Sequence, residues 1–129
     1  MTFPRAAGVL LHPTSLPGTD GIGDLGPDAH RFLDVLAQSG LKIWQMLPLG
    51  PTGYGDSPYQ CFSAFAGNPM LIHIPGGTPT NFPEHAVEWE HVLPYKRHRL
   101  RTALAAYTPD ARFQAFVREH TDWLPDYAL

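Results

Sequence analysis

A strand pattern, a helix pattern and a second strand pattern follow one another within the first 47 residues, and this order constrains the fold more than any other feature. Residues 8–12 form a short apolar run bounded by prolines, which is typical of a buried strand. Residues 41–47 form a second such run, with Ile43 and Trp44 at its centre. We therefore predict two short buried strands.

The segment between these two runs has the pattern of an amphipathic helix. Pro27 suits the first helical position, Asp28 complements the helix dipole, and Gly40 suits the turn that ends the helix. The apolar residues recur at the helical period, at Ala29, Phe32, Leu33 and Leu36. A strand–helix–strand unit of this kind places its two strands parallel and adjacent, so the expected fold class is α/β.

Such a parallel unit buries both faces of its sheet, so it needs further strands and helices around it. Two or three strands do not supply that cover, and a complete eight-stranded barrel needs about 250 residues. The chain has 129 residues. Either the later helices wrap a very small sheet, or the chain is the start of a larger protein, and we expect the second.

The rest of the chain divides into a long loop, a linker and helices. Residues 48–69 lack a helical or strand period, and a structureless loop of that length is usually functional or a sign that its elements are misassigned. Residues 70–74 predict a short third strand, and residues 76–83 predict a polar linker with a strong turn signal before it. The last third predicts helices, one of them with a stripe of Leu93, Lys96, Leu100, Ala103, Leu104 and Tyr107.

Two details of the helical part matter later. Pro109 and Asp110 start a further helix whose common face carries Phe113, Phe116 and Val117. A short basic cluster comprises Lys96, Arg97, Arg99 and Arg101. We predict that this cluster is a solvated helix face.

Composition argues against several classes of partner. The formal net charge is −3 and no basic stripe is present, so we expect no nucleic-acid partner. Cys61 is the single cysteine, and no set of metal ligands is visible, so we expect neither a metal nor a cofactor. One thiol without a signal-like start suits a reducing cytoplasm. No apolar run approaches the roughly 20 residues of a membrane span, so we expect no membrane partner.

The loop after the second strand carries the strongest candidate site. Function gathers at the carboxyl ends of parallel strands, and this loop places Tyr54, Asp56, Ser57 and Tyr59 there. Flat rings can pack on the apolar face of a sugar, and short polar groups can hydrogen-bond its hydroxyls. The alternatives are that Asp56 is only a turn residue and that the tyrosines are ordinary loop packing.

Catalytic residues are harder to find in this sequence. Hydrolysis of a glycosidic bond needs two carboxylates that flank it, and Asp24 with Asp56 is a conceivable pair for a small hydrolase, although we expect it not to act as one. Ser15 and Ser63 lack a visible histidine-and-acid arrangement. His12 at a strand end is expected to be structural. We therefore assign no catalytic residue.

Five motifs resemble one known family. They are GVLLHPTSLPG at 8–18, GIGDLG at 21–26, WQMLPLGPTG at 44–53, GDSPYQ at 55–60 and FSAFAGNP at 62–69. With this uninterrupted spacing the chain is similar to the opening of the bacterial 4-α-glucanotransferases, or amylomaltases. Weaker likeness returns at 94–96 and 123–129. Two departures are Cys61, where serine is usual, and the stretch 73–83.

The resemblance implies a (β/α)8 barrel with inserted subdomains. Residues 1–74 would form the first barrel strands and helix with the glucan-binding loop, and 75–129 a mainly helical part of an inserted subdomain. It also implies a retaining transfer of α-1,4-glucan segments to glucose or a maltooligosaccharide. In the family the two catalytic aspartates and the glutamate lie beyond position 129, so we expect this chain alone to be inactive.

Binding roles are what the resemblance carries over to residues of this chain. Tyr59 matches a tyrosine that packs on a sugar near the cleavage point, with Ser57 and Asp56 beside it. Tyr54 matches a ring at a second, outlying glucan site. The implied partners are maltooligosaccharides and α-1,4-glucans, and the full-length family is expected to be monomeric. The alternatives are a free-standing carbohydrate-binding module without catalysis and a purely structural domain.

Overall fold

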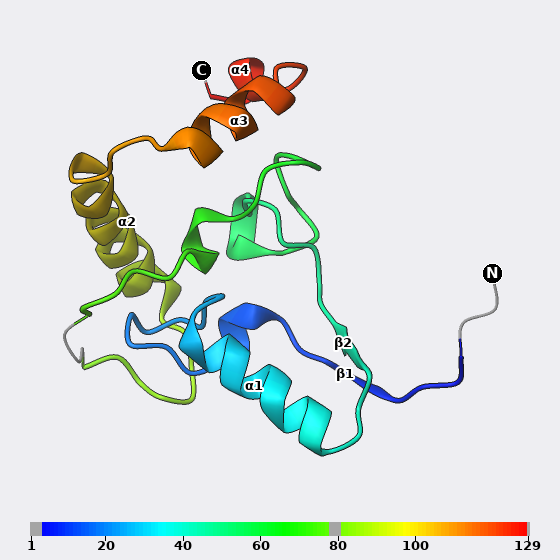
Figure 1. Cartoon of the computed structure of the whole chain (residues 1–129). Coiled ribbons are helices and arrows are strands. Elements are labelled where there is room, and N and C mark those ends of the chain that lie inside the picture. Colours follow the sequence, from blue (N-terminus) through cyan, green and yellow to red (C-terminus); the bar gives the residue numbers. More distant parts are fainter. Residues whose placement is uncertain (1–3, 78–80, 129) are drawn as a thin grey trace.

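Residues 8–45 contain a parallel two-stranded sheet with one crossing helix (Figure 1). The computed structural model describes residues 4–77 and 81–128. Strand β1 (Gly8–Leu10) pairs in parallel with β2 (Ile43–Gln45), and α1 (Pro27–Gln38) connects them. The predicted strand–helix–strand unit is confirmed, with strands shorter than the apolar runs suggested.

Helix α1 covers one face of this sheet. Val9 lies opposite Trp44 in the ladder, and the Trp44 ring meets Phe32 of α1 edge to face at 5.0 Å between ring centres. The other face carries Leu10 and Ile43, which are 57% and 48% exposed. The prediction of fully buried strands is therefore wrong, because α1 packs on one face and leaves the apolar side chains of the other in solvent.

The end of α1 follows the predicted stop signal. Gly40 has φ +73°, in the left-handed region that glycine adopts without strain. The N–H of Leu41 then donates to the carbonyl of Leu36 at 3.0 Å, which satisfies one of the last carbonyls of the helix. This turn delivers the chain directly into β2.

The apolar core lies away from the sheet, between the loop after β1 and helix α2 (Trp89–Ala105). Its buried members are Ile22, Met70 and Val92. Around them pack Phe82, Val87, Trp89, Leu93 and Leu100. In Figure 1, α2 accordingly stands at the opposite side of the molecule from the sheet.

Met70 belongs to a 3-10 helix, η3 (Pro69–Leu71), where we predicted a third strand. The side chain of Asn68 accepts a hydrogen bond from the N–H of Met70 at 2.9 Å, and Pro69 occupies the first helical position. An asparagine cap followed by proline starts a helical turn, so the strand prediction was wrong.

Two further helices close the described chain, at the top of Figure 1. They are α3 (Ala111–Glu119) and α4 (Leu124–Tyr127). Asp110 caps α3 by accepting from the N–H of Phe113 at 2.8 Å, which confirms the predicted start. Trp123 stacks on Phe65 of the long loop at 5.7 Å between ring centres, so aromatic contacts attach this end to the rest.

The basic cluster of α2 is only half solvated. Arg97 and Arg101 are exposed, as predicted. Lys96 is fully buried, and Arg99 is largely buried. The prediction was wrong for these two cations because the loop after β1 places the carboxylates of Asp20 and Asp24 against them.

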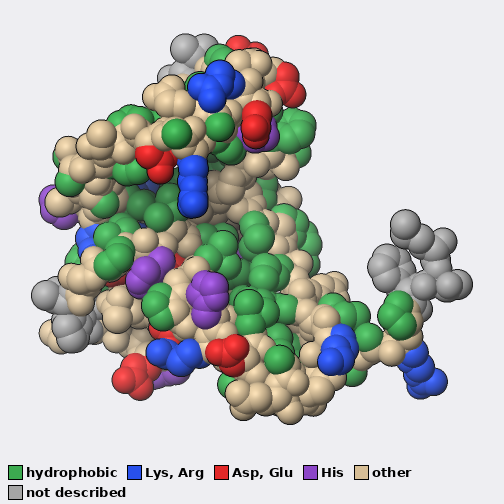
Figure 2. All heavy atoms as spheres, in the orientation of Figure 1, with side chains coloured by type: hydrophobic (Ala, Val, Ile, Leu, Met, Phe, Trp, Pro, Cys, Tyr) green, Lys and Arg blue, Asp and Glu red, His purple; other side chains and the backbone are tan. Residues whose placement is uncertain are grey.

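The surface view shows hydrophobic side chains spread over much of the visible face (Figure 2). Within residues 4–77 and 81–128, no helix is long and apolar enough to span a membrane. The same residues hold no group of three or more histidine, cysteine or acidic side chains arranged for a metal ion.

Candidate functional site

The long loop after β2 folds back on itself as an irregular hairpin. An antiparallel bridge joins Thr52 to Cys61. The N–H of Gly53 donates to the carbonyl of Gln60 at 2.9 Å. The tip of the hairpin is a short 3-10 turn, η2 (Tyr54–Asp56). The sequence of this loop has neither a helical nor a strand periodicity, but hydrogen bonds between its two arms define the path of its backbone.

The tip contains two successive residues with left-handed backbone. Gly55 has φ +69° and Asp56 has φ +53°. Glycine adopts this conformation freely, and aspartate tolerates it better than most residues do. Its short side chain explains why an aspartate can occupy this turn.

All four candidate residues lie on this hairpin. The rings of Tyr54 and Tyr59 are 92% and 73% exposed, whereas Asp56 and Ser57 are half-buried. The Ser57 hydroxyl accepts a hydrogen bond from the N–H of Tyr59 at 3.3 Å, which ties the serine to the backbone that carries the second ring. The arrangement offers two open aromatic faces with a carboxylate and a hydroxyl between them in the chain.

Two further aromatic side chains in this loop are exposed, and sequence reasoning did not single them out. They are Phe62 and Phe65. The signal was present in the sequence, because four aromatic residues fall within twelve positions of this loop, and exposed apolar patches often mark interaction sites. Phe65 stacks on Trp123. Phe62 is the additional exposed ring, and its N–H donates to the Pro51 carbonyl at 3.1 Å.

Helix α2 faces the hairpin across a cavity of about 600 Å³. The hairpin wall includes Gly53, Asp56 and Phe62. The α2 wall is made by Leu93, Arg97, Leu100 and Arg101. Asp56 therefore lies where the tip of the hairpin meets the space beside α2.

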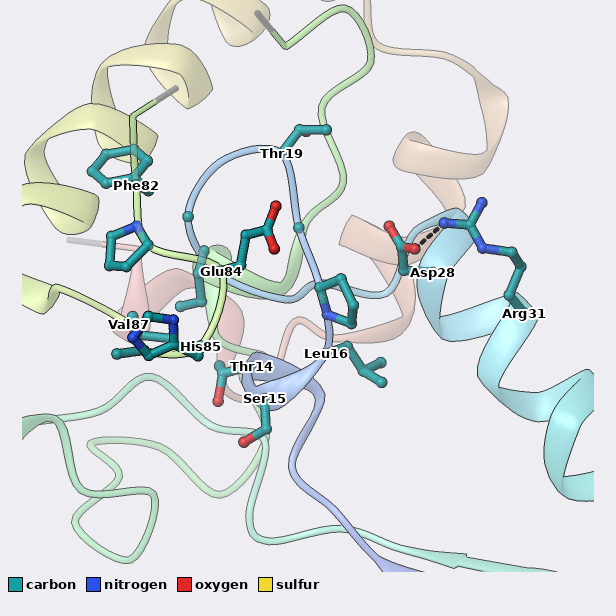
Figure 3. A pocket seen from close by; sticks show the side chains of 16 residues that line it. Thr14, Ser15, Leu16, Thr19, Asp28, Arg31, Phe82, Glu84, His85 and Val87 are labelled. Atoms are coloured by element: carbon teal, nitrogen blue, oxygen red, sulfur yellow. Dashed lines mark hydrogen bonds and ion pairs between the residues drawn. The ribbon is translucent and has the colours of Figure 1, made fainter. Parts of the chain in front are cut away.

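A second cavity, of about 780 Å³, lies between the loop 14–22 and residues 82–87 (Figure 3). Its labelled lining includes Ser15, Phe82 and His85, with the ion pair of Asp28 and Arg31 at its side. None of the four candidate residues lines it. It is thus separate from the hairpin site.

His12 is placed as a structural residue. Its Nδ1 lies 2.7 Å from the Thr14 hydroxyl and accepts from the Thr14 N–H at 3.4 Å, which starts a 3-10 turn, η1 (Pro13–Ser15). Burial lowers the pKa of His12 below 6.5, and the nearby backbone of Pro48 partly offsets this. A neutral imidazole suits its role as a cap.

The contacts of Asp24 are structural as well. Its carboxylate accepts from the N–H of Gly26 at 2.9 Å and lies 3.2 Å from both Lys96 Nζ and His73 Nδ1. Asp56 lies instead at the hairpin cavity, whose lining does not include Asp24. The placement of these two carboxylates speaks against the small hydrolase.

Comparison with known proteins decides the family. A profile described as 4-alpha-glucanotransferase matches residues 11–129. The chain belongs to the 4-alpha-glucanotransferase family. A 4-alpha-glucanotransferase of Thermus thermophilus is 46% identical over 148 aligned residues, and one of Synechocystis sp. is 42% identical over 147. Both alignments cover 100% of this chain and 29% of the relative.

The structure agrees with this assignment to the 4-alpha-glucanotransferase family. An amylomaltase from Streptococcus agalactiae, solved in complex with acarbose, superposes with a TM-score of 0.85 and 36% identity. The match covers 97% of this chain and 28% of that chain. The chain therefore has the fold of the corresponding part of an amylomaltase and spans less than a third of these relatives.

Proposed function

We propose that this chain supplies part of the α-1,4-glucan-binding wall of a 4-alpha-glucanotransferase, through Tyr54, Asp56, Ser57 and Tyr59. The observation that carries the proposal is the pair of exposed tyrosine rings on one ordered hairpin at the carboxyl end of β2. Each ring can pack on the apolar face of a glucose unit, and the Ser57 hydroxyl and Asp56 carboxylate can bond sugar hydroxyls.

The reaction of the complete enzyme would be a retaining transfer of glucan segments to an acceptor glucose or maltooligosaccharide. Two carboxyl groups flank the scissile bond in such chemistry. None of the acidic residues of this chain is assigned to that role. The chain would therefore hold and align glucan, and carboxylates from other parts of such an enzyme would break and form the bond.

We also propose that β1, α1 and β2 are the first elements of a (β/α)8 barrel. Residues 1–74 would form this barrel part, and residues 75–129, with α2, α3 and α4, would belong to an inserted subdomain. Similarity to an amylomaltase over almost the whole chain supports the barrel assignment. The exposed apolar face of Leu10 and Ile43 is consistent with a sheet that continues in a barrel.

Calorimetric titration of the purified chain with maltoheptaose tests the binding role. Tyr59→Ala should weaken the affinity about tenfold, since it removes one stacking ring. Tyr107→Ala is the matched control, because Tyr107 is a half-exposed tyrosine that follows α2 and lies outside the hairpin. Equal affinities of the wild type and Tyr59→Ala would overturn the proposed site.

A free-standing carbohydrate-binding module is the second candidate, because the exposed rings need no carboxylate pair to bind sugar. Mixing the chain with a separately expressed carboxyl-terminal part of a family member separates the two. Disproportionation of maltotriose by the mixture, and by neither part alone, supports the transferase role. Maltoheptaose binding without any activity in the mixture supports the module.

A further inference from the structure

A buried ionic cluster attaches α2 to the loop after β1. The side chain of Lys96 has no solvent exposure, and its Nζ lies 3.2 Å from Asp24 Oδ2 and 4.0 Å from Asp20 Oδ2. Arg99 forms a hydrogen-bonded ion pair with Asp20. Two carboxylates and two cations balance in charge, which is the condition under which ions remain charged in a protein interior.

The same cluster holds the segment that follows η3. The Arg99 guanidinium donates from Nη2 to the carbonyls of Ile74 and Pro75, at 3.1 and 3.0 Å. The Nδ1 of His73 lies 3.2 Å from Asp24 Oδ2. Helix α2 is therefore bound through side chains to two segments that lie on either side of the hairpin in the sequence.

The adjoining face of α2 borders the hairpin at Asp56, which is the residue of the proposed glucan site that lines the cavity. Across the cavity of about 600 Å³, this face lies opposite Asp56 and Gly53 of the hairpin. Lys96 is three residues from the first and five from the last of the α2 residues that line the cavity, so it lies beside this wall on the helix. These lining residues are Leu93, Arg97, Leu100 and Arg101.

The ionic contacts add direction-dependent contacts to the apolar contacts of α2. Val92 packs against Ile22 and Met70, and Leu93 and Leu100 pack around the same core, so apolar contacts already turn this side of α2 inward. Hydrogen-bonded ion pairs depend on direction and distance. The contact between Lys96 and Asp24 therefore narrows the range of rotation that the apolar contacts allow α2, and with it the position of the cavity wall.

We propose that Lys96 is a positioning residue for glucan binding, which fixes α2 and thereby the cavity wall opposite Asp56. Lys96 does not touch the sugar and acts through the helix. The proposal rests on the glucan-binding role proposed above for the hairpin.

Three variants of the chain test it. Lys96→Met removes the ammonium and keeps an unbranched side chain. Asp24→Asn/Lys96→Met also removes the carboxylate charge that would be left unpaired, while Asp20 and Arg99 remain paired, so this variant retains a charge-balanced interior. Lys96→Arg keeps the charge. Unfolding in denaturant establishes that each variant is folded before maltoheptaose is titrated.

The affinity for maltoheptaose should fall about tenfold in the folded Asp24→Asn/Lys96→Met variant. The affinity of Lys96→Arg for maltoheptaose should stay within about twofold of the wild-type affinity, because this variant keeps a cation beside Asp24. Wild-type affinity in the folded double variant would overturn the positioning role, because the ionic contact would then be dispensable for the cavity wall.

A second readout needs no sugar. The backbone amide chemical shifts of residues 53–57 should differ from the wild type in the double variant, and should not differ in Arg112→Met, which removes an exposed cation from α3. Unchanged amide shifts of 53–57 in the double variant would overturn the positioning role. A wild-type chain that binds no maltoheptaose would overturn the proposed function instead, and the amide shifts would still decide the role of Lys96.

Discussion

The Nζ of Lys96 lies 3.2 Å from the Oδ2 of Asp24, although 72 positions separate the two residues in the chain. Lys96→Met leaves the carboxylate of Asp24 buried without its cation. We expect the free energy of unfolding to fall by about 3 kcal/mol, the usual consequence of breaking a buried pair from one side. Arg97→Met, one residue further along α2 and exposed, should change it by less than about 0.5 kcal/mol. Equal losses in both variants, measured by denaturant titration, would contradict the burial of Lys96.

Gly23 is required because its backbone lies close against the backbone of the turn from Pro13 to Leu16. A Cβ at this position would lie 2.1 Å from the carbonyl oxygen of Pro13 and 2.5 Å from that of Leu16. Because these atoms belong to the backbone, Gly23→Ala should lower the free energy of unfolding by about 2 kcal/mol or more. A Cβ at Gly67 would have no other atom within 4 Å, so Gly67→Ala is the matched control. Its free energy of unfolding should stay near that of the wild type.

The stability of the chain should depend on pH through His12. Its pKa is lowered below 6.5 by burial, whereas the unfolded chain takes up this proton at its ordinary pKa. Between the two pKa values the unfolded state binds more protons, so the free energy of unfolding falls as the pH is lowered below 6.5. Above that pH, His12 adds no pH dependence.

The variant His12→Asn isolates this contribution. Asparagine keeps an acceptor for the N–H of Thr14 and does not titrate. Denaturant titrations between about pH 7 and about pH 5 should show a smaller decline for His12→Asn than for the wild type, as the linkage relation requires. Parallel declines would mean that His12 titrates normally in the folded chain.

The stacked rings of Phe65 and Trp123 attach the carboxyl-terminal helices to the long loop. A double-mutant cycle with Phe65→Leu and Trp123→Leu should give a coupling free energy of about 1 kcal/mol. The pair Tyr107 and Phe113, whose rings lie 6.1 Å apart within the helical part, gives a reference for an aromatic contact that does not involve the loop. A coupling energy near zero for Phe65 and Trp123 would mean that this contact does not hold α4.

The features predicted well from sequence are those set by local chemistry. Pro27 begins α1 and Gly40 follows its end. The effects of a proline without an N–H and of a glycine with φ +73° extend over only about one turn, so neighbouring residues are enough to predict them. Asp110 caps α3 for the same reason. Parallel pairing of β1 with β2 followed from the length of the connection, which needs no knowledge of distant contacts.

The failures concern contacts between distant parts of the chain. The position of Lys96 in the apolar stripe of its helix was a signal that it is buried. Its partners could not be predicted in the same way, because Asp24 and Asp20 lie 72 and 76 positions earlier in the chain. The hairpin that carries Tyr54 and Tyr59 has no period, because its order comes from single backbone contacts such as the bridge between Thr52 and Cys61.

Nuclear magnetic resonance titration of the chain with maltoheptaose tests the central claim most directly. The backbone amides of residues 53–57, 59 and 60 should shift with increasing sugar, and Tyr59→Ala should weaken that response. Shifts confined to the cavity between residues 14–22 and 82–87, or no shifts at all, would contradict a glucan-binding role for the hairpin.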